Sequence, residues 1–193
     1  MMSKSRKFRK IILKSEVSVL EEEEFAEQYE IYNSEFSNDF SLELAYLKHL
    51  QEQAKQDTEN EEKEVQDKFS NEFLKSLHRQ LARVLHPDLN QDSNDEDFKK
   101  MQAAYEIGDA AVLISLAASY NVNIELDDED IEKIEQQINF KNNKINKKKR
   151  TCLWIWGTSI KNEAMKDQIR NALGIDENKF KEWLAKYNEE INN

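Results

Sequence analysis

The sequence predicts an all-α protein. Its 193 residues include three glycines and one proline, so the residues that most often interrupt helices are scarce. Glu, Lys, Gln and Leu, which favour helices, are abundant, and 35% of the residues are charged. Apolar residues recur at steps of three and four, the spacing of one helix face. We therefore expect an antiparallel helical hairpin flanked by further amphipathic helices, with an elongated or coiled-coil arrangement left open.

Three segments are expected along the chain. Residues 1–60 would form an N-terminal helical arm, 61–120 a hairpin with a helix packed on it, and 121–193 a C-terminal helical region with an aromatic cluster. The total length suits one domain or two small ones.

The arm begins with a basic run. Residues 4–10 carry five cations, which we interpret as a solvated, mobile terminus, with an anion-binding arm as the alternative. A helix is then predicted over 11–33. Its inward stripe would be Leu13, Val17, Leu20, Phe25, Tyr29 and Tyr32. The sequence "NSEFSNDFS" predicts a break, followed by a second helix. The stripe of that helix would be Phe40, Leu44, Leu47 and Leu50.

Two such helices cannot bury their stripes alone. They would pair as a hairpin, pack on the following segment, or associate with another chain. Residues 53–64 contain no apolar side chain beyond Ala54, so we expect a linker or a fully exposed helix there.

The central segment holds a helix that ends at Pro87, the single proline. Proline disfavours the α conformation at the preceding residue and lacks an N–H, so the helix should end at Leu85 or His86. Its apolar face would consist of Phe69, Phe73, Leu77, Leu81, Val84 and Leu85. Its opposite, water-facing side would carry Lys75, His78, Arg79 and Arg83.

A second helix follows a polar loop. Asn94 or Asp95 would cap it, and Phe98, Met101 and Tyr105 would face inward. Two helices joined by a turn of this length should pack antiparallel, so the tip would present His86 and Asp88 beside the basic face.

The stretch "LHRQLARVLHPDLNQDSNDEDFKKMQAAYE" resembles the J-domain of DnaJ-type co-chaperones. That family has a basic helix, an HPD turn, and a second helix ending in alanine-tyrosine-glutamate, here Ala104 to Glu106. The resemblance implies a J-domain-like fold and a DnaK-type chaperone as partner, whose ATP hydrolysis would be stimulated. The partner-binding residues it implies are His86, Pro87, Asp88, Lys75, Arg79 and Arg83.

The chain departs from that family on both sides of the hairpin. The short tyrosine-rich helix that opens most J-domains has no counterpart upstream. Downstream, Gly108 should end the second helix and Asp109 should cap an apolar helix, "AAVLISLAASY". We expect this helix to pack on the hairpin in place of the missing one.

The C-terminal region should contain three further helical pieces. Asp127 or Asp128 would cap a helix with Ile131, Ile134 and Ile138 inward, ending in the cations of "NKKKR". A phosphate-binding patch is the alternative for those cations. A helix from about residue 161 would end at Gly174, and Asp176 would cap the last helix. Its inward stripe would be Phe180, Trp183, Leu184 and Tyr187.

Between these helices, "TCLWIWGT" suits a short extended piece because Trp154 and Trp156 alternate. We interpret the two indoles as packing anchors, with a client-binding surface as the alternative. Together with Trp183 they would form one small aromatic cluster.

The sequence contains no motif of an enzyme, cofactor site or metal site, so we expect a binding protein. The formal net charge of −11 argues against nucleic-acid binding, and no apolar run reaches transmembrane length. The single cysteine, Cys152, and the lack of a signal-like apolar stretch favour the cytoplasm. A rival hypothesis is a structural or assembly protein, such as a viral particle or scaffold component, that forms a homo-oligomer.

Overall fold

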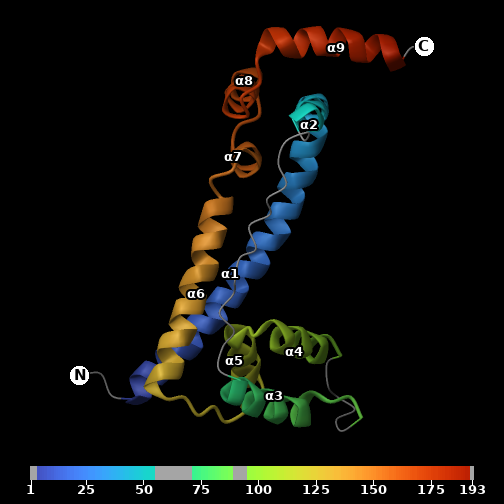
Figure 1. The fold of residues 1–193 in the computed structure, drawn as a ribbon. Coiled ribbons are helices and arrows are strands. Elements are labelled where there is room, and N and C mark those ends of the chain that lie inside the picture. The colour runs from blue at the N-terminus through green and yellow to red at the C-terminus, as the bar shows by residue number, and fades with distance from the viewer. Residues whose placement is uncertain (1–3, 55–70, 89–94, 192–193) are drawn as a thin grey trace. The chain divides into compact units, whose positions relative to one another are not determined.

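The computed structural model describes residues 4–54, 71–88 and 95–191 (Figure 1). All regular secondary structure in these ranges is α-helical, which confirms the predicted fold class. The helices are α1 (Lys4–Asp39), α2 (Ser41–Ala54), α3 (Asn71–Leu85), α4 (Asp95–Ile107), α5 (Ala110–Ser119), α6 (Asp128–Lys148), α7 (Cys152–Thr158), α8 (Glu163–Ala172) and α9 (Glu177–Ile191). The expected linker over 53–64 lies almost wholly outside these ranges, as do Phe69 and Asn94.

The chain forms two compact units. Unit 1 comprises Met1–Phe25 and Val65–Ile145, and unit 2 comprises Ala26–Glu64 and Asn146–Asn193. Each unit is therefore assembled from stretches that are far apart in sequence. The three consecutive segments expected from the sequence remain a prediction about domain organisation.

Unit 1 is centred on the hairpin of α3 and α4, with α5 packed on both helices (Figure 1). α5 is the most apolar of the three helices, and it contributes six buried side chains to the core of the unit. These are Ala110, Ala111, Leu113, Ile114, Leu116 and Ala117. The expectation that this helix packs on the hairpin is confirmed. α1 adds Ile11 to the same core, and α6 adds Ile134 and Ile138.

The start of α5 is fixed by a cap that the sequence predicts. Gly108 takes a positive φ of 76°, and the Asp109 side chain accepts a hydrogen bond from the backbone N–H of Val112 at 3.3 Å. The same carboxylate pairs with Lys141 of α6, which also pairs with Glu22 of α1 at 2.7 Å. Burial alone would lower the pKa of Lys141, but the two carboxylates raise it above its ordinary value. This charge cluster joins α1, α5 and α6.

α1 is longer than the sequence predicts. It begins at Lys4, so the residues interpreted as a mobile terminus are helical. It also runs without a break to Asp39. The expected break is confined to Phe40, between the end of α1 and the start of α2 at Ser41. The rest of the stretch stays helical because Ser and Asn weaken a helix only slightly, and no glycine or proline lies between residues 33 and 41. Phe36, which lies inside that stretch, is buried.

The first half of the inward face of α1 also differs from the prediction, whereas Phe25 is buried as expected. Leu13, Val17 and Leu20 are 53%, 52% and 64% exposed. The buried residues of this stretch are Ile11, Ser15, Ser18 and Val19. The prediction placed the larger apolar side chains inward, whereas the structure buries a face that includes two small serines. Small side chains let a neighbouring helix approach closely, which the apolar spacing alone does not reveal.

Unit 2 has two small cores. The first gathers Phe36, Phe40, Trp156 and Ile169, and the second gathers Tyr46, Ile175 and Phe180. An ion pair also joins α2 to α8: the buried Glu43 accepts from Arg170 Nε at 2.8 Å. Asp176 caps α9 as predicted, accepting from the N–H of Asn178 at 3.0 Å.

The "TCLWIWGT" segment is the helix α7 and not an extended piece. Thr151 occupies its N-cap, which accounts for a helix start that the alternation of tryptophans hides. Trp154 and Trp156 are 9% and 4% exposed, so packing anchors describe them, and we propose no client-binding role for them. Gly157 lies directly against the ring of Tyr32, where a Cβ would overlap the ring.

The three tryptophans of unit 2 do not form one cluster, which corrects the prediction. Trp154 packs edge-on against Tyr32 at a centroid distance of 5.2 Å. Trp156 packs against Phe40 at 4.9 Å and donates from Nε1 to Asp39 at 2.8 Å. Trp183 lies in the second core, 5.4 Å from Tyr46. Each indole therefore anchors a different contact.

Candidate functional site

The candidate site begins where α3 ends. The helix stops at Leu85, as predicted, and the N–H of His86 still donates to the carbonyl of Ala82 at 3.0 Å. Pro87 and Asp88 then form an exposed turn. Because proline fixes φ and has no N–H to bond, the chain leaves the helix at a defined point.

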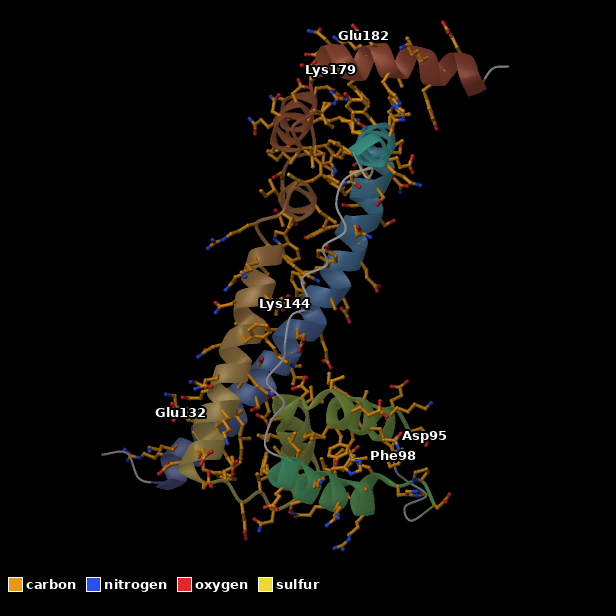
Figure 2. The ribbon with its side chains drawn as sticks, in the orientation of Figure 1. Asp95, Phe98, Glu132, Lys144, Lys179 and Glu182 are labelled. Atoms are coloured by element: carbon orange, nitrogen blue, oxygen red, sulfur yellow. The ribbon has the colours of Figure 1, made fainter. Side chains whose placement is uncertain are left out.

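The His86 ring is held in place by two contacts. Its Nδ1 accepts a hydrogen bond from the backbone N–H of Asp88 at 3.1 Å. It also packs against the Phe98 ring in the first turn of α4, with ring centroids 5.3 Å apart and planes 69° apart. Figure 2 shows Phe98 close to the described end of the hairpin. The His86 side chain is 40% exposed, so the ring is ordered but still accessible.

The Asp88 carboxylate points into solvent, with its side chain 88% exposed. Its Oδ2 lies 3.9 Å from His86 Nδ1, which is too long for a hydrogen bond. The turn therefore presents a carboxylate that accepts hydrogen bonds and an imidazole whose Nε2 carries the proton when the ring is neutral.

A row of cations runs along α3 beside this turn. Lys75, Arg79 and Arg83 are spaced by four residues and are all exposed, as the sequence predicts. Leu74, Leu77, Leu81 and Leu85 are buried on the opposite face. The three cations border a shallow polar hollow of about 500 Å³. Its other lining residues are Glu72, Ser76 and Gln80.

His78 is not part of that solvent-facing row. Its ring stacks on Tyr105 of α4 with centroids 4.2 Å apart and planes 25° apart. Partial burial lowers the pKa of His78 below its ordinary value, which favours the neutral ring. The sequence prediction was wrong here because a histidine between Lys75 and Arg79 on a helix is expected to belong to the basic face, whereas in the structure its ring packs against α4.

Sequence reasoning also missed two contacts that fix α4. One is the Phe98–His86 contact described above. The other is the Tyr120 hydroxyl at the end of α5, which donates to Asp97 at 2.6 Å. This hydrogen bond raises the pKa of Tyr120. Both contacts join α4 to the end of another helix, so the periodicity of a single helix does not predict them. The sequence signal for each contact is an aromatic residue near a helix end.

Comparison with known families supports this geometry. Residues 59–107 match the family model of the DnaJ domain. The chain carries a DnaJ-type J-domain. The match includes α3, the His86–Asp88 turn and α4, whereas α5, which packs on both helices, lies beyond it. No match to the chain is found among curated proteins or among solved structures.

The J-domain therefore holds all six residues expected to bind a partner. Five of them are exposed, and the sixth, His86, is half-exposed with its ring fixed by the turn. Partner binding by these residues stays a prediction. Within the described residues, no group of His, Cys, Asp or Glu is arranged to hold a metal, and no helix is long and apolar enough to cross a membrane.

Proposed function

We propose that this protein is a co-chaperone that binds a DnaK-type chaperone through its HPD turn and the basic face of α3, and stimulates its ATP hydrolysis. The observation that carries the proposal is an accessible HPD turn beside a row of exposed cations, inside a segment that matches the DnaJ domain.

The two parts of the surface would act differently. Lys75, Arg79 and Arg83 are exposed and long, so they would speed encounter with an acidic surface on the chaperone. The HPD turn would supply the specific contacts. Asp88 would accept hydrogen bonds, and His86 would donate from Nε2 because its Nδ1 already accepts from the Asp88 N–H. Since Pro87 and Phe98 hold the turn, few side chains need ordering on binding.

In this proposal the protein is not itself an enzyme and needs no cofactor. Its effect is on the ATPase of its partner, and its single cysteine suits the reducing cytoplasm where such chaperones work.

The test is the steady-state ATPase rate of a DnaK-type chaperone with increasing amounts of the full chain. We expect stimulation by the wild type and its loss, by about tenfold or more, in the His86→Gln variant. His49→Gln is the matched control, because His49 is exposed on α2, outside the J-domain. The proposal fails if the wild type does not stimulate, or if His86→Gln stimulates as well as His49→Gln.

A further inference from the structure

A groove of about 550 Å³ lies between α1 and α6 in unit 1. The two helices run in the same direction along it (Figure 1). Lys7 pairs with Asp128 at 3.1 Å, and seven residues farther along both helices Lys14 pairs with Glu135 at 2.6 Å. The two walls of the groove therefore stand in a fixed register, in which an α6 residue is level with the α1 residue 121 positions earlier.

Side chains of three kinds line the groove from one end to the other. Arg6 and Arg9 form a basic end, Leu13 and Val17 of α1 with Ile138 of α6 form an apolar middle, and Glu21 with Asn142 of α6 forms an acceptor end. The α1 members are all exposed, and their steps of three and four place them along one face of the helix. The lining therefore changes along the groove from cations, through apolar side chains, to groups that accept hydrogen bonds.

The charged side chains at the two ends are not those that hold unit 1 together. Among the described residues, no ion pair involves either end, whereas Lys7, Lys14 and Glu22 of the same helix are all paired with α6. The remaining charges of the groove act on one another. The hydrogen bond from Lys14 lowers the pKa of Glu135, and the charge of Lys10 adds to this effect. The two ends can therefore be changed without breaking an ion pair of unit 1.

Two buried polar atoms show what the acceptor end requires. Ser18 lines the groove next to this end and is 2% exposed. Within the described part of the chain, neither Ser18 Oγ nor Asn142 Oδ1 has a hydrogen-bond partner. Asn142 is level with Glu21, so an amide oxygen and a carboxylate, which only accept, line the groove at the same height. Because a buried acceptor without a donor is costly, this end favours a ligand that donates hydrogen bonds.

We propose that the groove binds an amphipathic helix of a partner protein, with acidic side chains at one end and lysine or arginine at the other. The carboxylates of that helix would pair with Arg6 and Arg9, since guanidinium groups bind carboxylates through two hydrogen bonds. Its apolar side chains would cover the apolar middle, and its cation would donate to Glu21 and to the Asn142 amide oxygen. A uniformly anionic partner, such as a nucleic acid, matches the basic end alone.

The length of the groove favours a helix over an extended segment. Arg9 and Glu21 are twelve residues apart, which is about 18 Å along α1. A partner helix covers this distance with apolar side chains at steps of three and four, which meet the same steps on α1. An extended segment would cover it in about five or six residues and would point every second side chain away. The proposal does not depend on the co-chaperone function, since the HPD turn and the α3 cations are not part of this groove.

The test measures the binding of labelled peptides to the full chain by fluorescence anisotropy. Peptide A is a helix with glutamates at one end, lysines at the other, and leucines at steps of three and four between them. Peptide B carries lysines at both ends, and peptide C is peptide A with a proline at its centre. We expect the wild type to bind A about tenfold or more tightly than B, although its net charge of −11 favours B. Peptide C should not bind, because proline breaks the helix.

Reversing the basic end should reverse this preference. The double variant Arg6→Glu with Arg9→Glu should bind peptide B and lose affinity for peptide A by about tenfold or more. Its matched control is Lys179→Glu with Lys186→Glu, at exposed positions of α9 in unit 2. The control changes the net charge by the same amount and should bind the peptides like the wild type.

A pair of asparagine variants tests the acceptor end. Asn142→Ala should weaken the binding of peptide A by about fivefold, the effect of losing one hydrogen bond. Asn143→Ala makes the same change at the next position of α6, which is exposed and does not line the groove, and should bind like the wild type. Far-UV circular dichroism checks that every variant is folded. The ATPase assay reports separately on the J-domain, so failure of this proposal and failure of the co-chaperone proposal are distinguishable.

Several results would overturn the helix-binding groove. These are equal binding of peptides A and B by the wild type, binding of peptide C as tight as that of A, and loss of peptide A by the α9 control. Equal affinities of the two asparagine variants would also overturn it. A dimer of the chain that peptide A dissociates in sedimentation equilibrium would assign the groove to a second copy, and the partner helix would be wrong.

Discussion

His78 couples the packing of the α3–α4 hairpin to pH. Its ring stacks on Tyr105, and burial lowers its pKa below the ordinary value of 6.5. The unfolded chain therefore takes up the proton at a higher pH than the folded chain. The stability that the neutral ring contributes is fully present above pH 6.5 and is lost as pH falls from there through the lowered pKa.

We expect this loss to disappear in the His78→Phe variant, whose ring can keep the stack but cannot be protonated. The free energy of unfolding in urea, measured from about pH 8 to about pH 5, should fall more for the wild type than for the variant. The other titratable groups are common to both proteins and cancel in the difference. Two curves that run parallel through this range would show that His78 does not titrate differently on folding.

Single residues that act over short sequence distances are the ones the sequence predicts best. Asp109, Asp127 and Asp176 all accept hydrogen bonds from backbone N–H groups two or three residues ahead, as predicted. A cap of this kind depends on a few consecutive residues, so its pattern is local. The partner of His78 is 27 residues away, and nothing near His78 in the sequence identifies Tyr105.

Among the elements, α7 depends on a close approach to α1 within unit 2. Gly157 lies against the Tyr32 ring, and Trp154 of the same helix packs edge-on against that ring. A methyl group at position 157 would overlap the ring, so α7 or Tyr32 must move. We expect Gly157→Ala to lower the free energy of unfolding by about 1–3 kcal/mol, the usual cost of overpacking.

Tryptophan fluorescence during urea unfolding measures this effect, because all three tryptophans of the sequence lie in unit 2. Ile155→Ala is the control on the same helix. Ile155 is 40% exposed, and its truncation should change stability by about 0.5 kcal/mol or less. If Gly157→Ala proves as stable as the wild type, the close contact with Tyr32 does not constrain α7.

The elements also show where helical periodicity is insufficient. Periodicity predicts α3 correctly, because its face of buried leucines and its face of cations differ sharply. In α1 the apolar residues form one stripe and the buried residues another, since Ser15 and Ser18 are buried while Leu13 and Leu20 are exposed. Which stripe faces the core depends on neighbours such as α6, and the spacing along α1 carries no information about them.

At the scale of the whole molecule, composition predicts the helical class but not the pairing of helices. Lys14 pairs with Glu135, and Arg170 pairs with Glu43, each across more than a hundred residues. Charged residues are so common in this chain that no pair of this kind can be selected from the sequence alone. The J-domain is the exception, because its helices and turn are adjacent in sequence and carry a family pattern.

The whole chain has a formal net charge of −11, yet the proposed chaperone-binding face of α3 is cationic. An acidic partner surface would be repelled by the molecule as a whole and attracted by Lys75, Arg79 and Arg83. Salt shortens the range of both effects, from about 10 Å at 0.1 M to about 3 Å at 1 M. The attraction in the complex is between close charges, and it should dominate the salt dependence of binding.

We expect the concentration of protein that gives half-maximal ATPase stimulation to rise with salt for the wild type. For the double variant Arg79→Gln with Arg83→Gln, this half-maximal concentration should be higher than that of the wild type at low salt and should change less as salt increases. Lys144→Gln with Lys179→Gln removes the same charge from exposed sites outside the J-domain and should follow the wild type. Equal salt dependence in all three proteins would mean that the α3 cations do not face the chaperone.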